Sequence, residues 1–578
     1  MIKTLAKQIK EYKKDSILSP IYIAAEVILE LLLPFIMASM IDDGVEVGNM
    51  KHIVITGIIM LVVAMLSLFC GAMCGKHAAI ASTGFARNVR KSMFDNIQTF
   101  SFANIDKFST AGLITRMTTD VTNVQQAYQM IIRMCVRAPL MLITAMIMVV
   151  IINAKLALIY LVALVILGVA LFFIISNARK AFMEMFKKYD SLNSSTQENI
   201  SAIRVVKAYV REDHEIGKFK KACLNLYLSS VKAEKLVILN SPIMMFVMYG
   251  SILLLSWLGA QMIVVGDLTT GNLSSMFTYS TNILMSLMMI SMVIVMLTMS
   301  QASAERIVEV LNEKSTITNP KNPVMEVKDG SISFENVQFS YNTEEPKYVL
   351  HDINLEIKAG ETIGILGGTG SSKSSLVQLI PRLYDVTEGC VKVGGIDVKE
   401  YDLDVLRNEV SMVLQKNVLF SGSIKENLRW GNKDATDEEM IHACKLAEAH
   451  DFIESFPDKY DTHIEQGGTN VSGGQKQRLC IARALLKKPK ILILDDSTSA
   501  VDTKTDAYIR KAFREEIPGT TKLIIAQRIS SIQDADRIVV LNEGRIESVG
   551  THEELLKISP IYQEVYNTQV KGGDEDGK

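Results

Sequence analysis

Long apolar runs dominate the chain before residue 300 and limit what it can fold into. Several are long enough to cross a bilayer, which takes about 20 predominantly apolar residues in a helix. We expect membrane spans at roughly 17–41, 53–80, 138–152 with an apolar lead-in from 130, 155–176, 236–265 and 272–298. The third span is the least regular, because Arg133 and Arg137 lie in its first turns. The first half of the chain is therefore predicted to be an all-α, six-helix transmembrane domain.

The charge between these runs predicts their orientation. Two segments of more than 50 residues, 81–137 and 177–235, are rich in Lys and Arg, as is the N-terminus, whereas the short 42–52 connection is acidic. Cytoplasmic loops carry the excess of positive charge. Both termini and both long segments are therefore expected in the cytoplasm. Their helical patterning predicts spans that continue past the bilayer and turn at each tip.

The second half of the chain is mixed in composition, like a soluble domain. At 578 residues the chain is too long for one core. Residues 313–330 contain Pro320 and Pro323 and lose the apolar periodicity, which is typical of a linker. We expect a transmembrane domain over 1–312, this linker, a second domain over 331–570 and a polar tail over 571–578.

Composition also argues against two classes of partner. A net charge of −2 and a pI near 6.5 give no reason to expect nucleic-acid binding. The seven cysteines show no metal-ligand spacing.

A glycine-rich turn follows the apolar strand expected over 361–366. It reads Gly367-Gly368-Thr369-Gly370-Ser371-Ser372-Lys373-Ser374-Ser375 and opens a helix. Backbone N–H groups of such a turn approach phosphates closely, and a helix N-terminus favours negative charge. Lys373 is expected to reach the β- and γ-phosphates of a nucleotide, and Ser374 to ligate Mg²⁺. A plain strand–helix turn is the alternative, but the Lys-Ser pair and a later apolar strand ending in Asp495-Asp496 favour a P-loop. The P-loop pattern normally has Gly before the Lys, where this chain has Ser372.

The segment Val471-Ser472-Gly473-Gly474-Gln475-Lys476-Gln477-Arg478 resembles the signature sequence of ATP-binding cassette (ABC) ATPases. In that motif a Ser hydroxyl and glycine amides at a helix start can hold a γ-phosphate presented by a second subunit. The resemblance covers the whole domain and implies an α/β P-loop ABC ATPase fold. It implies that Tyr341 stacks on adenine, that Gln415 senses Mg²⁺ and touches the membrane half, and that Asp495 directs Mg²⁺. It also matches Ser499-Ala-Val-Asp502 to the loop that crosses between paired sites.

The membrane half resembles ABC exporters. Residues 112–120 and 202–212 are similar to the two cytoplasmic loop regions of that family, and 302–311 to the end of its sixth helix. The resemblance implies domain-swapped helices, a head-to-tail pair of nucleotide domains and ATP-driven alternating access. We expect the tips of the two cytoplasmic segments to dock on the nucleotide domains, and 112–120 and 202–212 to couple them to transport.

Two positions depart from the chemistry of the family. A Glu normally follows the Mg²⁺-directing Asp and a His normally ends the later strand, but this chain has Asp496 and Gln527 there. Aspartate is one methylene shorter, and a misplacement on the order of 1 Å can cost ~10²-fold in rate. Gln527 can donate a hydrogen bond to a phosphate but cannot become a cation. These candidate catalytic positions predict a site that binds ATP and hydrolyses it slowly. Tolerated drift in a working site is the weaker alternative, because Ser372 makes three departures in one site.

Together these features resemble the non-consensus-site subunit of heterodimeric bacterial multidrug ABC exporters. We expect one subunit of an ATP-driven efflux pump in a prokaryotic plasma membrane, using ATP and Mg²⁺. Its expected partners are a second ABC half-transporter subunit, membrane lipid and a small amphipathic substrate. Two rivals remain: a homodimeric lipid or peptide exporter that hydrolyses ATP at both sites, and a membrane-bound ATP-responsive regulator. No motif names the substrate.

Several residues within or near the predicted spans have two interpretations. Glu26 and Glu30 lie one helical turn apart, and could form a site for cationic compounds or a structural hydrogen-bonded pair near the outer leaflet. Asp42 and Asp43 could help an external gate or lie in a solvated acidic loop. A stripe of methionines at helical spacing could line a substrate cavity or serve ordinary packing and lipid contact. Its members are Met285, Met288, Met289, Met292, Met296 and Met299.

Overall fold

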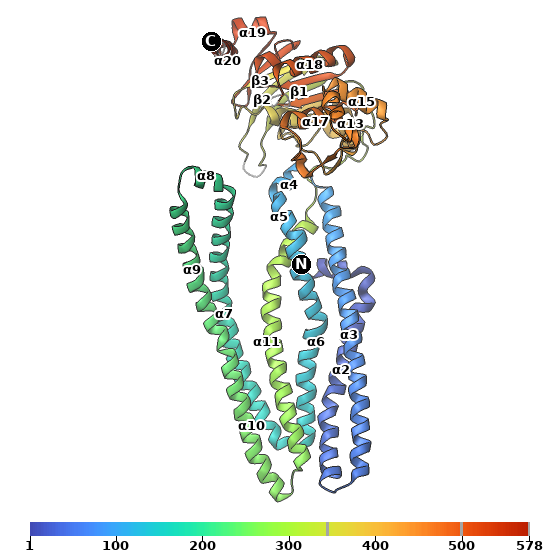
Figure 1. Cartoon of the computed structure of the whole chain (residues 1–578), viewed down its shortest axis with the longest axis vertical. Helices are drawn as coiled ribbons and strands as arrows, with labels where there is room; N and C mark the ends of the chain where they lie inside the picture. Colours follow the sequence, from blue (N-terminus) through green and yellow to red (C-terminus); the bar gives the residue numbers. More distant parts are fainter. Residues whose placement is uncertain (343–345, 497–500, 576–578) are drawn as a thin grey trace. The chain divides into compact units, whose positions relative to one another are not determined.

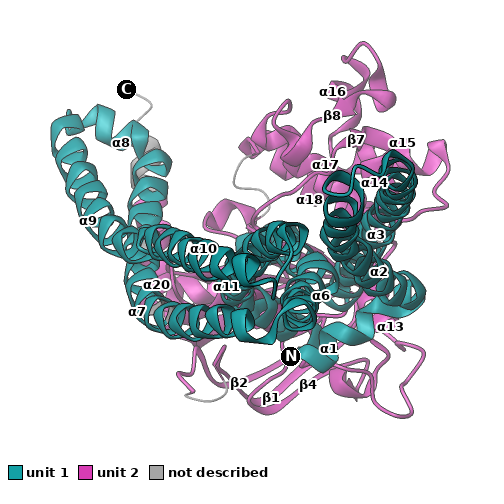
Figure 2. Ribbon diagram, turned by 90° about the horizontal axis from the view of Figure 1, so that it is seen from below, with its two compact units in different colours: residues 1–98, 110–313 teal, residues 99–109, 314–578 magenta. Residues whose placement is uncertain are grey.

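The computed structural model describes residues 1–342, 346–496 and 501–575 (Figure 1). The chain divides into two compact units, which Figure 2 shows in different colours. The first unit comprises Met1–Gln98 and Thr110–Glu313, and the second comprises Thr99–Ser109 and Lys314–Lys578.

The first unit is helical throughout its described elements. These are α1 (Ile2–Ala6), η1 (Lys7–Tyr12), α2 (Lys13–Ser39), η2 (Met40–Val45), α3 (Met50–Gln98), α5 (Thr110–Thr115), η3 (Arg116–Asp120), α6 (Val121–Ile152), α7 (Ala154–Ser201), α8 (Ile203–Ala208), α9 (Glu212–Ile238), α10 (Asn240–Val265) and α11 (Thr270–Asn312). Within the described residues, 6 helical stretches are long and apolar enough to cross a membrane. They are Ile2–Val45, Met50–Gln98, Thr110–Ile152, Ala154–Ser201, Glu212–Val265 and Thr270–Asn312. The prediction of a six-helix transmembrane domain is confirmed.

The second cytoplasmic segment forms a long hairpin. Helices α7 and α9 run side by side, and the short α8 closes their end (Figure 1). This end presents apolar side chains to solvent, since Tyr209 is 75% exposed and Val210 is 81% exposed. The helices therefore continue past the apolar span and turn at a tip, as their patterning predicted.

Polar side chains and one glycine stabilise the short turns at the other end of the helices. Asn153 is the N-cap of α7, and its Oδ1 accepts hydrogen bonds from the backbone N–H groups of Lys155 and Leu156. Gly266, with a left-handed backbone at φ 87°, ends α10. The Asp42 carboxylate accepts hydrogen bonds from the Gly271 backbone N–H at 2.8 Å and from the Thr269 hydroxyl at 2.6 Å. Asp42 is therefore bonded to the start of α11, and the expectation of a merely solvated loop is wrong for this residue.

One arginine forms ion pairs with both carboxylates of the first span. Arg137 of α6 donates to Glu26 Oε1 at 2.6 Å and to Glu30 Oε2 at 2.7 Å. The carboxylates therefore share Arg137 as their ion-pair partner, an arrangement that neither of the two interpretations from the sequence includes. Charged groups inside a membrane are costly unless paired, so the same contact explains how α6 holds Arg137 within a span.

The second unit is an α/β fold around two larger sheets. Its strands are β1 (Ile332–Phe339), β2 (Leu350–Ile357), β3 (Thr362–Gly367), β4 (Glu388–Val393), β5 (Ile396–Asp397), β6 (Val410–Val413), β7 (Gly422–Ser423), β8 (His463–Ile464), β9 (Ile491–Asp495), β10 (Thr521–Ile525), β11 (Arg537–Asn542) and β12 (Arg545–Gly550). Its helices of five or more residues are α4 (Phe102–Phe108), α12 (Lys373–Gln378), α13 (Leu403–Glu409), α14 (Ile424–Arg429), α15 (Asp437–Leu446), α16 (His450–Glu454), α17 (Gly473–Leu485), α18 (Thr503–Glu516), α19 (His552–Ile558) and α20 (Pro560–Glu575).

The larger sheet has the strand order β12-β11-β3-β10-β9-β6, and the smaller has the order β2-β1-β4-β5. All neighbours in the larger sheet pair in parallel except the edge strand β12. Strands β9 and β10 are buried at every position, which is why they read as continuous apolar runs in the sequence.

Helix α4 comes from the first cytoplasmic segment but belongs to this second unit. Ser101 caps it in a reciprocal capping box with Asn104. The Asn104 side chain also donates to the Lys314 carbonyl and accepts from the Thr316 backbone N–H. Asn104 thus joins α4 to the segment that leads into the sheets of the second unit.

Candidate functional site

The parallel pairing brings the predicted site residues to one edge of the sheet. Ile525 of β10 is paired with Ile365 of β3 and with Asp495 of β9. The carboxyl ends of parallel strands meet at the same edge, where ligands of α/β folds bind. The P-loop, Asp495-Asp496 and Gln527 all follow or end these three strands, so the structure collects them in one place.

The P-loop has the turn geometry that phosphate binding requires, with one strained residue. Gly370 adopts a φ of 86°, which glycine tolerates freely. Ser372, where the pattern has Gly, adopts a left-handed φ of 68° as the N-cap of α12, and its side chain makes no capping hydrogen bond. The loop therefore keeps its shape at the cost of backbone strain in Ser372.

Lys373 lies folded over the loop. Its Nζ donates to the carbonyl oxygens of Gly367 and Gly368, both at 2.8 Å, and to Ser371 Oγ at 3.3 Å. Burial lowers the pKa of Lys373, against the opposing attraction of Asp496 and Asp495. A triphosphate in the loop would compete for this ammonium group and favour its charged form.

Hydroxyl and carboxylate oxygens meet where Mg²⁺ is expected. Ser374 Oγ donates to Asp495 Oδ1 at 2.9 Å. Burial, and to a lesser degree the Asp496 carboxylate, raises the pKa of Asp495, whose side chain is almost fully enclosed. Oxygen ligands of these two kinds suit Mg²⁺, so the residues fit the ion. Gln415, also expected near Mg²⁺, lies beside the same group of residues, with its Nε2 3.5 Å from Asp496 Oδ2.

The two candidate catalytic residues are bonded to each other. Gln527 Nε2 donates to Asp496 Oδ2 at 2.9 Å, and Gln415 Nε2 approaches the same oxygen at 3.5 Å. Asp496 itself has a left-handed φ of 49°. Two amides therefore converge on one carboxylate oxygen, and they fix where this short carboxylate lies relative to the P-loop.

The expected adenine-stacking residue lies in a cluster of aromatic rings. The Tyr341 hydroxyl is 2.8 Å from Ser375 Oγ, which ties the ring to the helix of the P-loop. The Tyr384 ring meets Tyr341 edge-on, with ring centroids 5.1 Å apart. Tyr341 is 48% exposed, so a face of its ring is open to a stacking partner.

Sequence reasoning missed Tyr384 and its partner in α4. The Tyr384 hydroxyl donates to Asp106 Oδ2 at 2.6 Å, and the Tyr384 ring lies edge-on to Phe102. Burial and the Asp106 carboxylate hold the pKa of Tyr384 well above its usual range. The signal that could have revealed α4 is the capping pattern Ser101-x-x-Asn104 directly after the end of α3.

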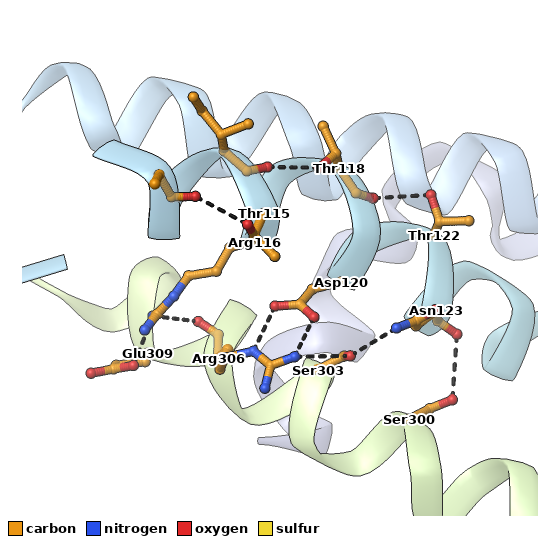
Figure 3. Close-up of polar contacts among 12 residues, drawn as sticks. Thr115, Arg116, Thr118, Asp120, Thr122, Asn123, Ser300, Ser303, Arg306 and Glu309 are labelled. Carbon is orange, nitrogen blue, oxygen red and sulfur yellow. Dashed lines mark hydrogen bonds and ion pairs between the residues drawn. The ribbon is translucent and has the colours of Figure 1, made fainter. Parts of the chain in front are cut away.

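The 112–120 region, which we expect to take part in coupling, forms a junction between elements of the first unit. Residues 112–120 lie in α5 and η3, within the first unit, and bond to α11 (Figure 3). The Arg306 guanidinium forms an ion pair with the buried Asp120, with Nε donating to Oδ2 at 2.7 Å. Arg116 pairs with Glu309 at 2.7 Å. Helix α4 of the same segment belongs to the second unit. The coupling role of 112–120 stays a prediction.

The signature motif begins a helix at the protein surface. Ser472 is the N-cap of α17 and forms a capping box with Gln475, whose backbone N–H donates to Ser472 Oγ. Capping uses a lone pair of this oxygen, so its O–H can still donate to a phosphate. Ser472 and Gly473 are exposed, and Gly474 is partly exposed. Of the loop expected at Ser499–Asp502, Ser499 and Ala500 lie outside the described residues.

Comparison with known proteins identifies both halves of the chain. Residues 16–301 match the family model of the ABC transporter transmembrane region, and 350–499 match the family model described as ABC transporter. An uncharacterised ABC transporter ATP-binding protein of Bacillus subtilis, YfiB, is 37% identical over 97% of each chain. An ATP-dependent lipid A-core flippase of Desulfotalea psychrophila is 34% identical over 84% of each chain. A putative multidrug export protein of B. subtilis, YgaD, is 30% identical over 98% of this chain and 99% of its own.

A solved structure has the same fold. A bacterial Atm1-family ABC exporter with ATP bound superimposes with a TM-score of 0.80, at 24% sequence identity, over 97% of this chain and 98% of that one. The match extends over both units and agrees with the predicted order, a helical transmembrane domain followed by an α/β ATPase domain.

Proposed function

The chain belongs to the ABC transporter family, with the transmembrane region and the ATPase domain fused as in exporters, and we propose that it is the non-consensus-site subunit of an ATP-driven efflux transporter. In this proposal the chain's own site binds ATP and hydrolyses it poorly. Its signature motif completes the hydrolytic site of a second, different subunit.

The observation that carries this proposal is the bonding of Asp496. Gln527 and Gln415 both direct amide groups at one carboxylate oxygen, and the shorter side chain reaches less far than the usual Glu. A general base must lie within hydrogen-bond reach of the attacking water. ATP retention with slow hydrolysis follows, because the P-loop, Ser374 and Asp495 keep the groups that hold phosphates and Mg²⁺. Bound Mg²⁺ would supply charge neutralisation at the phosphates.

Exposed apolar groups support the presence of a second subunit. Tyr209 and Val210 at the end of the α7–α9 hairpin have few neighbours of their own, as their exposure shows. On the ATPase unit, Phe420 and Trp430 stack with ring centroids 4.1 Å apart while remaining 44% and 65% exposed. Exposed patches of this kind mark protein interfaces. We infer that the hairpin tip of each subunit docks on such a patch of the other.

The methionine stripe supports an amphipathic substrate. Met285, Met288, Met292 and Met299 are 43–64% exposed, so packing within this chain does not use these side chains fully. Flexible thioethers adapt to varied apolar shapes. The positive-inside distribution supports an orientation with both termini and the ATPase domain in the cytoplasm. We propose the prokaryotic plasma membrane as the location.

A homodimeric lipid exporter is the second candidate, and the 34% identity with a lipid A-core flippase favours it. The name of that protein describes its own substrate and does not identify the substrate of this chain. The two candidates differ in whether the purified chain alone hydrolyses ATP at full rate, which only the homodimer would do.

The test restores the consensus residues. In a complex whose partner site has been inactivated, we expect Asp496→Glu with Gln527→His to raise steady-state ATPase activity by about tenfold or more, since a misplaced catalytic group costs up to about 10²-fold. Gln527→Ala is the matched control and should leave the rate low. An unchanged rate in the restored variant, with ATP still bound, would show that the two residues do not limit hydrolysis.

ATP-dependent uptake of an amphipathic dye into inside-out vesicles distinguishes the pump from a regulator, which would move no dye.

A further inference from the structure

The segment that carries Gln527 is anchored on both sides. Before it lies strand β10, which is paired with β3 and β9. After it, the Ser531 hydroxyl donates to Asp506 Oδ2 at 2.9 Å, and Asp506 is only 3% exposed. The backbone of residues 527–529 lies between these two anchors and outside the sheet. Its position therefore depends on contacts of its own.

One glutamine of the last helix, α20, bonds to both ends of this stretch. The Gln569 Nε2 donates to the Gln527 carbonyl at 2.8 Å, and the Gln569 Oε1 accepts from the Ile529 backbone N–H at 2.9 Å. Ile529 begins the short helix η7 (Ile529–Ser531), and the first N–H groups of a helix have no partner within it. One side-chain amide thus supplies a donor and an acceptor at once, and it fixes the backbone on either side of Arg528.

Helix α20 can hold Gln569 in place because the helix itself is docked on the core. Tyr562 is fully buried, and its hydroxyl oxygen lies 2.6 Å from Nδ1 of His552 in α19. Tyr566 packs against the core cluster that also contains Ile529. Positions 562, 566 and 569 share one face of the helix, since residues three and four apart lie above one another. The face that buries the two tyrosines therefore presents Gln569 to residues 527–529.

The two Gln569 hydrogen bonds reach the nucleotide site through Gln527. The Gln527 side-chain amide donates to Asp496 Oδ2 at 2.9 Å, and the Asp496 carboxylate attracts the ammonium group of Lys373 in the P-loop. The Gln527 backbone carbonyl is held by Gln569, so a shift of α20 displaces the amide on the other side of the same residue. A neutral amide of this kind can donate a hydrogen bond to a phosphate.

We propose that Gln569 is a positioning residue of this chain's own nucleotide site, through which helix α20 sets how tightly the site retains ATP. Gln569 does not touch the nucleotide. It fixes the backbone of Gln527, whose side-chain amide donates to the γ-phosphate. This inference rests on the proposed function, because it names a contact that retains ATP in the slowly hydrolysing site. ADP has no γ-phosphate, so the contact distinguishes ATP from ADP.

Photolabelling of this chain in the purified transporter tests the proposal. The probes are azido-ATP and azido-ADP, which label the chain whose P-loop holds the nucleotide. Gln569 is exposed, so Gln569→Leu removes the two hydrogen bonds and leaves the core intact. We expect this variant to weaken azido-ATP binding by about three- to tenfold, the equivalent of a hydrogen bond of ordinary strength, and to leave azido-ADP binding unchanged.

The same helix offers a matched control. The Gln563 Nε2 donates to the Leu556 carbonyl at 2.8 Å, so this glutamine also joins α20 to a backbone group, but one that belongs to α19. Gln563→Leu should change neither affinity. Gln569→Glu keeps an acceptor for the Ile529 N–H and loses the donor to the Gln527 carbonyl, and it should weaken azido-ATP binding as Gln569→Leu does.

A double-mutant cycle separates positioning from a merely structural role. In a Gln527→Ala background the side-chain amide is absent, so Gln569→Leu should change azido-ATP binding by less than about twofold. Hydrogen exchange of the Ile529 backbone N–H should still accelerate by about threefold or more in both backgrounds, because the bond to Gln569 is lost in each.

Four outcomes would overturn the proposal. These are unchanged azido-ATP binding in Gln569→Leu, equal weakening of azido-ATP and azido-ADP binding, the same loss from Gln563→Leu, and full additivity of Gln569→Leu with Gln527→Ala. The second and third would show that α20 supports only the stability of the domain. These measurements do not involve hydrolysis, so they are independent of the restored variant that tests the proposed function.

Discussion

At the residue scale, Ser372 makes the P-loop of this chain different from one with glycine before the lysine. Its φ of 68° belongs to the left-handed region, where a residue with a Cβ is strained by roughly 1–3 kcal/mol. Glycine has no Cβ and adopts this conformation freely, although its greater freedom in the unfolded chain costs roughly 0.5–1 kcal/mol.

We therefore predict that Ser372→Gly raises the thermal stability of the ATPase domain, with a gain of about 1 kcal/mol and a shift in melting temperature of roughly 2–4 °C. The measurement is the apparent melting temperature of the purified protein. Thr369→Gly is the matched control, because Thr369 lies in the same loop but is not among the residues with positive φ, so it should lose stability. A loss of stability in Ser372→Gly would show that the hydroxyl, and not the backbone, determines the loop.

The sequence predicts the site residues that lie close to one strand end and misses those that depend on distant contacts. Motif spacing places Lys373 and Ser374 on a strand–turn–helix, and the structure brings them to Asp495 through parallel pairing. Tyr384 and Asp106 are 278 residues apart in sequence. No local pattern links such residues, because their contact depends on where the first cytoplasmic segment packs. For the same reason, the sequence did not predict the pairing of Arg137 with Glu26.

At the scale of elements, one tyrosine joins α4 to the nucleotide-binding unit. The Tyr384 hydroxyl donates to Asp106, and burial with that carboxylate raises the pKa of Tyr384. The hydroxyl therefore stays protonated, and keeps donating, at neutral and mildly alkaline pH. A hydrogen bond to a charged group contributes about 1.5–3 kcal/mol.

We predict that Tyr384→Phe loosens α4 while leaving ATP binding nearly intact. Hydrogen exchange of residues 102–108 should accelerate by about tenfold or more, since 1.4 kcal/mol corresponds to a factor of ten. Tyr348→Phe is the control, because the Tyr348 hydroxyl also donates to a carboxylate, Glu388, at 2.8 Å, but its ring lies edge-on to His351 and not to a residue of α4. Unchanged exchange in Tyr384→Phe would mean that the aromatic packing alone holds α4.

The junction of η3, α6 and α11 offers a second comparison between elements (Figure 3). Asp120 is 1% exposed and pairs with Arg306, whereas Glu309, which pairs with Arg116, has a side chain 45% exposed. The difference lies in the carboxylates, because the Arg306 side chain is itself 47% exposed and can be hydrated. An amide at the buried position 120 would lose charge-assisted hydrogen bonds that water does not replace, whereas the half-exposed position 309 is hydrated in either form.

We predict that Asp120→Asn lowers the free energy of unfolding by about 2 kcal/mol and that Glu309→Gln lowers it by less than about 1 kcal/mol. Apparent melting temperatures in detergent compare the two variants directly. Similar shifts would mean that burial of Asp120 does not make its ion pair the stronger support of this junction.

At the scale of the whole molecule, the broad architecture follows from two physical constraints that the sequence displays openly. A helix that crosses a membrane needs a long apolar run of residues. A parallel strand that is buried on both faces is short and apolar at nearly every position. The six helices and the α/β ATPase domain are accordingly confirmed. The pairing of subunits lies beyond such patterns, because an interface is distinguished by complementarity between two surfaces and not by one chain's periodicity.

The last prediction concerns the division of labour between subunits. In a head-to-tail pair, this chain's signature at Ser472 closes the partner's site, while Asp496 and Gln527 belong to the site that the partner's signature closes. We predict that replacing the catalytic Glu of the partner subunit nearly abolishes steady-state ATPase activity, since a general base contributes about 10²–10⁴-fold. Asp496→Ala should cost much less, because the short Asp496 side chain reaches less far toward an attacking water than Glu does and little hydrolysis is expected to pass through it. The two mutant complexes are measured side by side, with ATP-analogue binding as the control for folding. Comparable loss from both replacements, or a fully active purified homodimer of this chain, would contradict the asymmetric arrangement and favour an exporter that hydrolyses ATP at two equivalent sites.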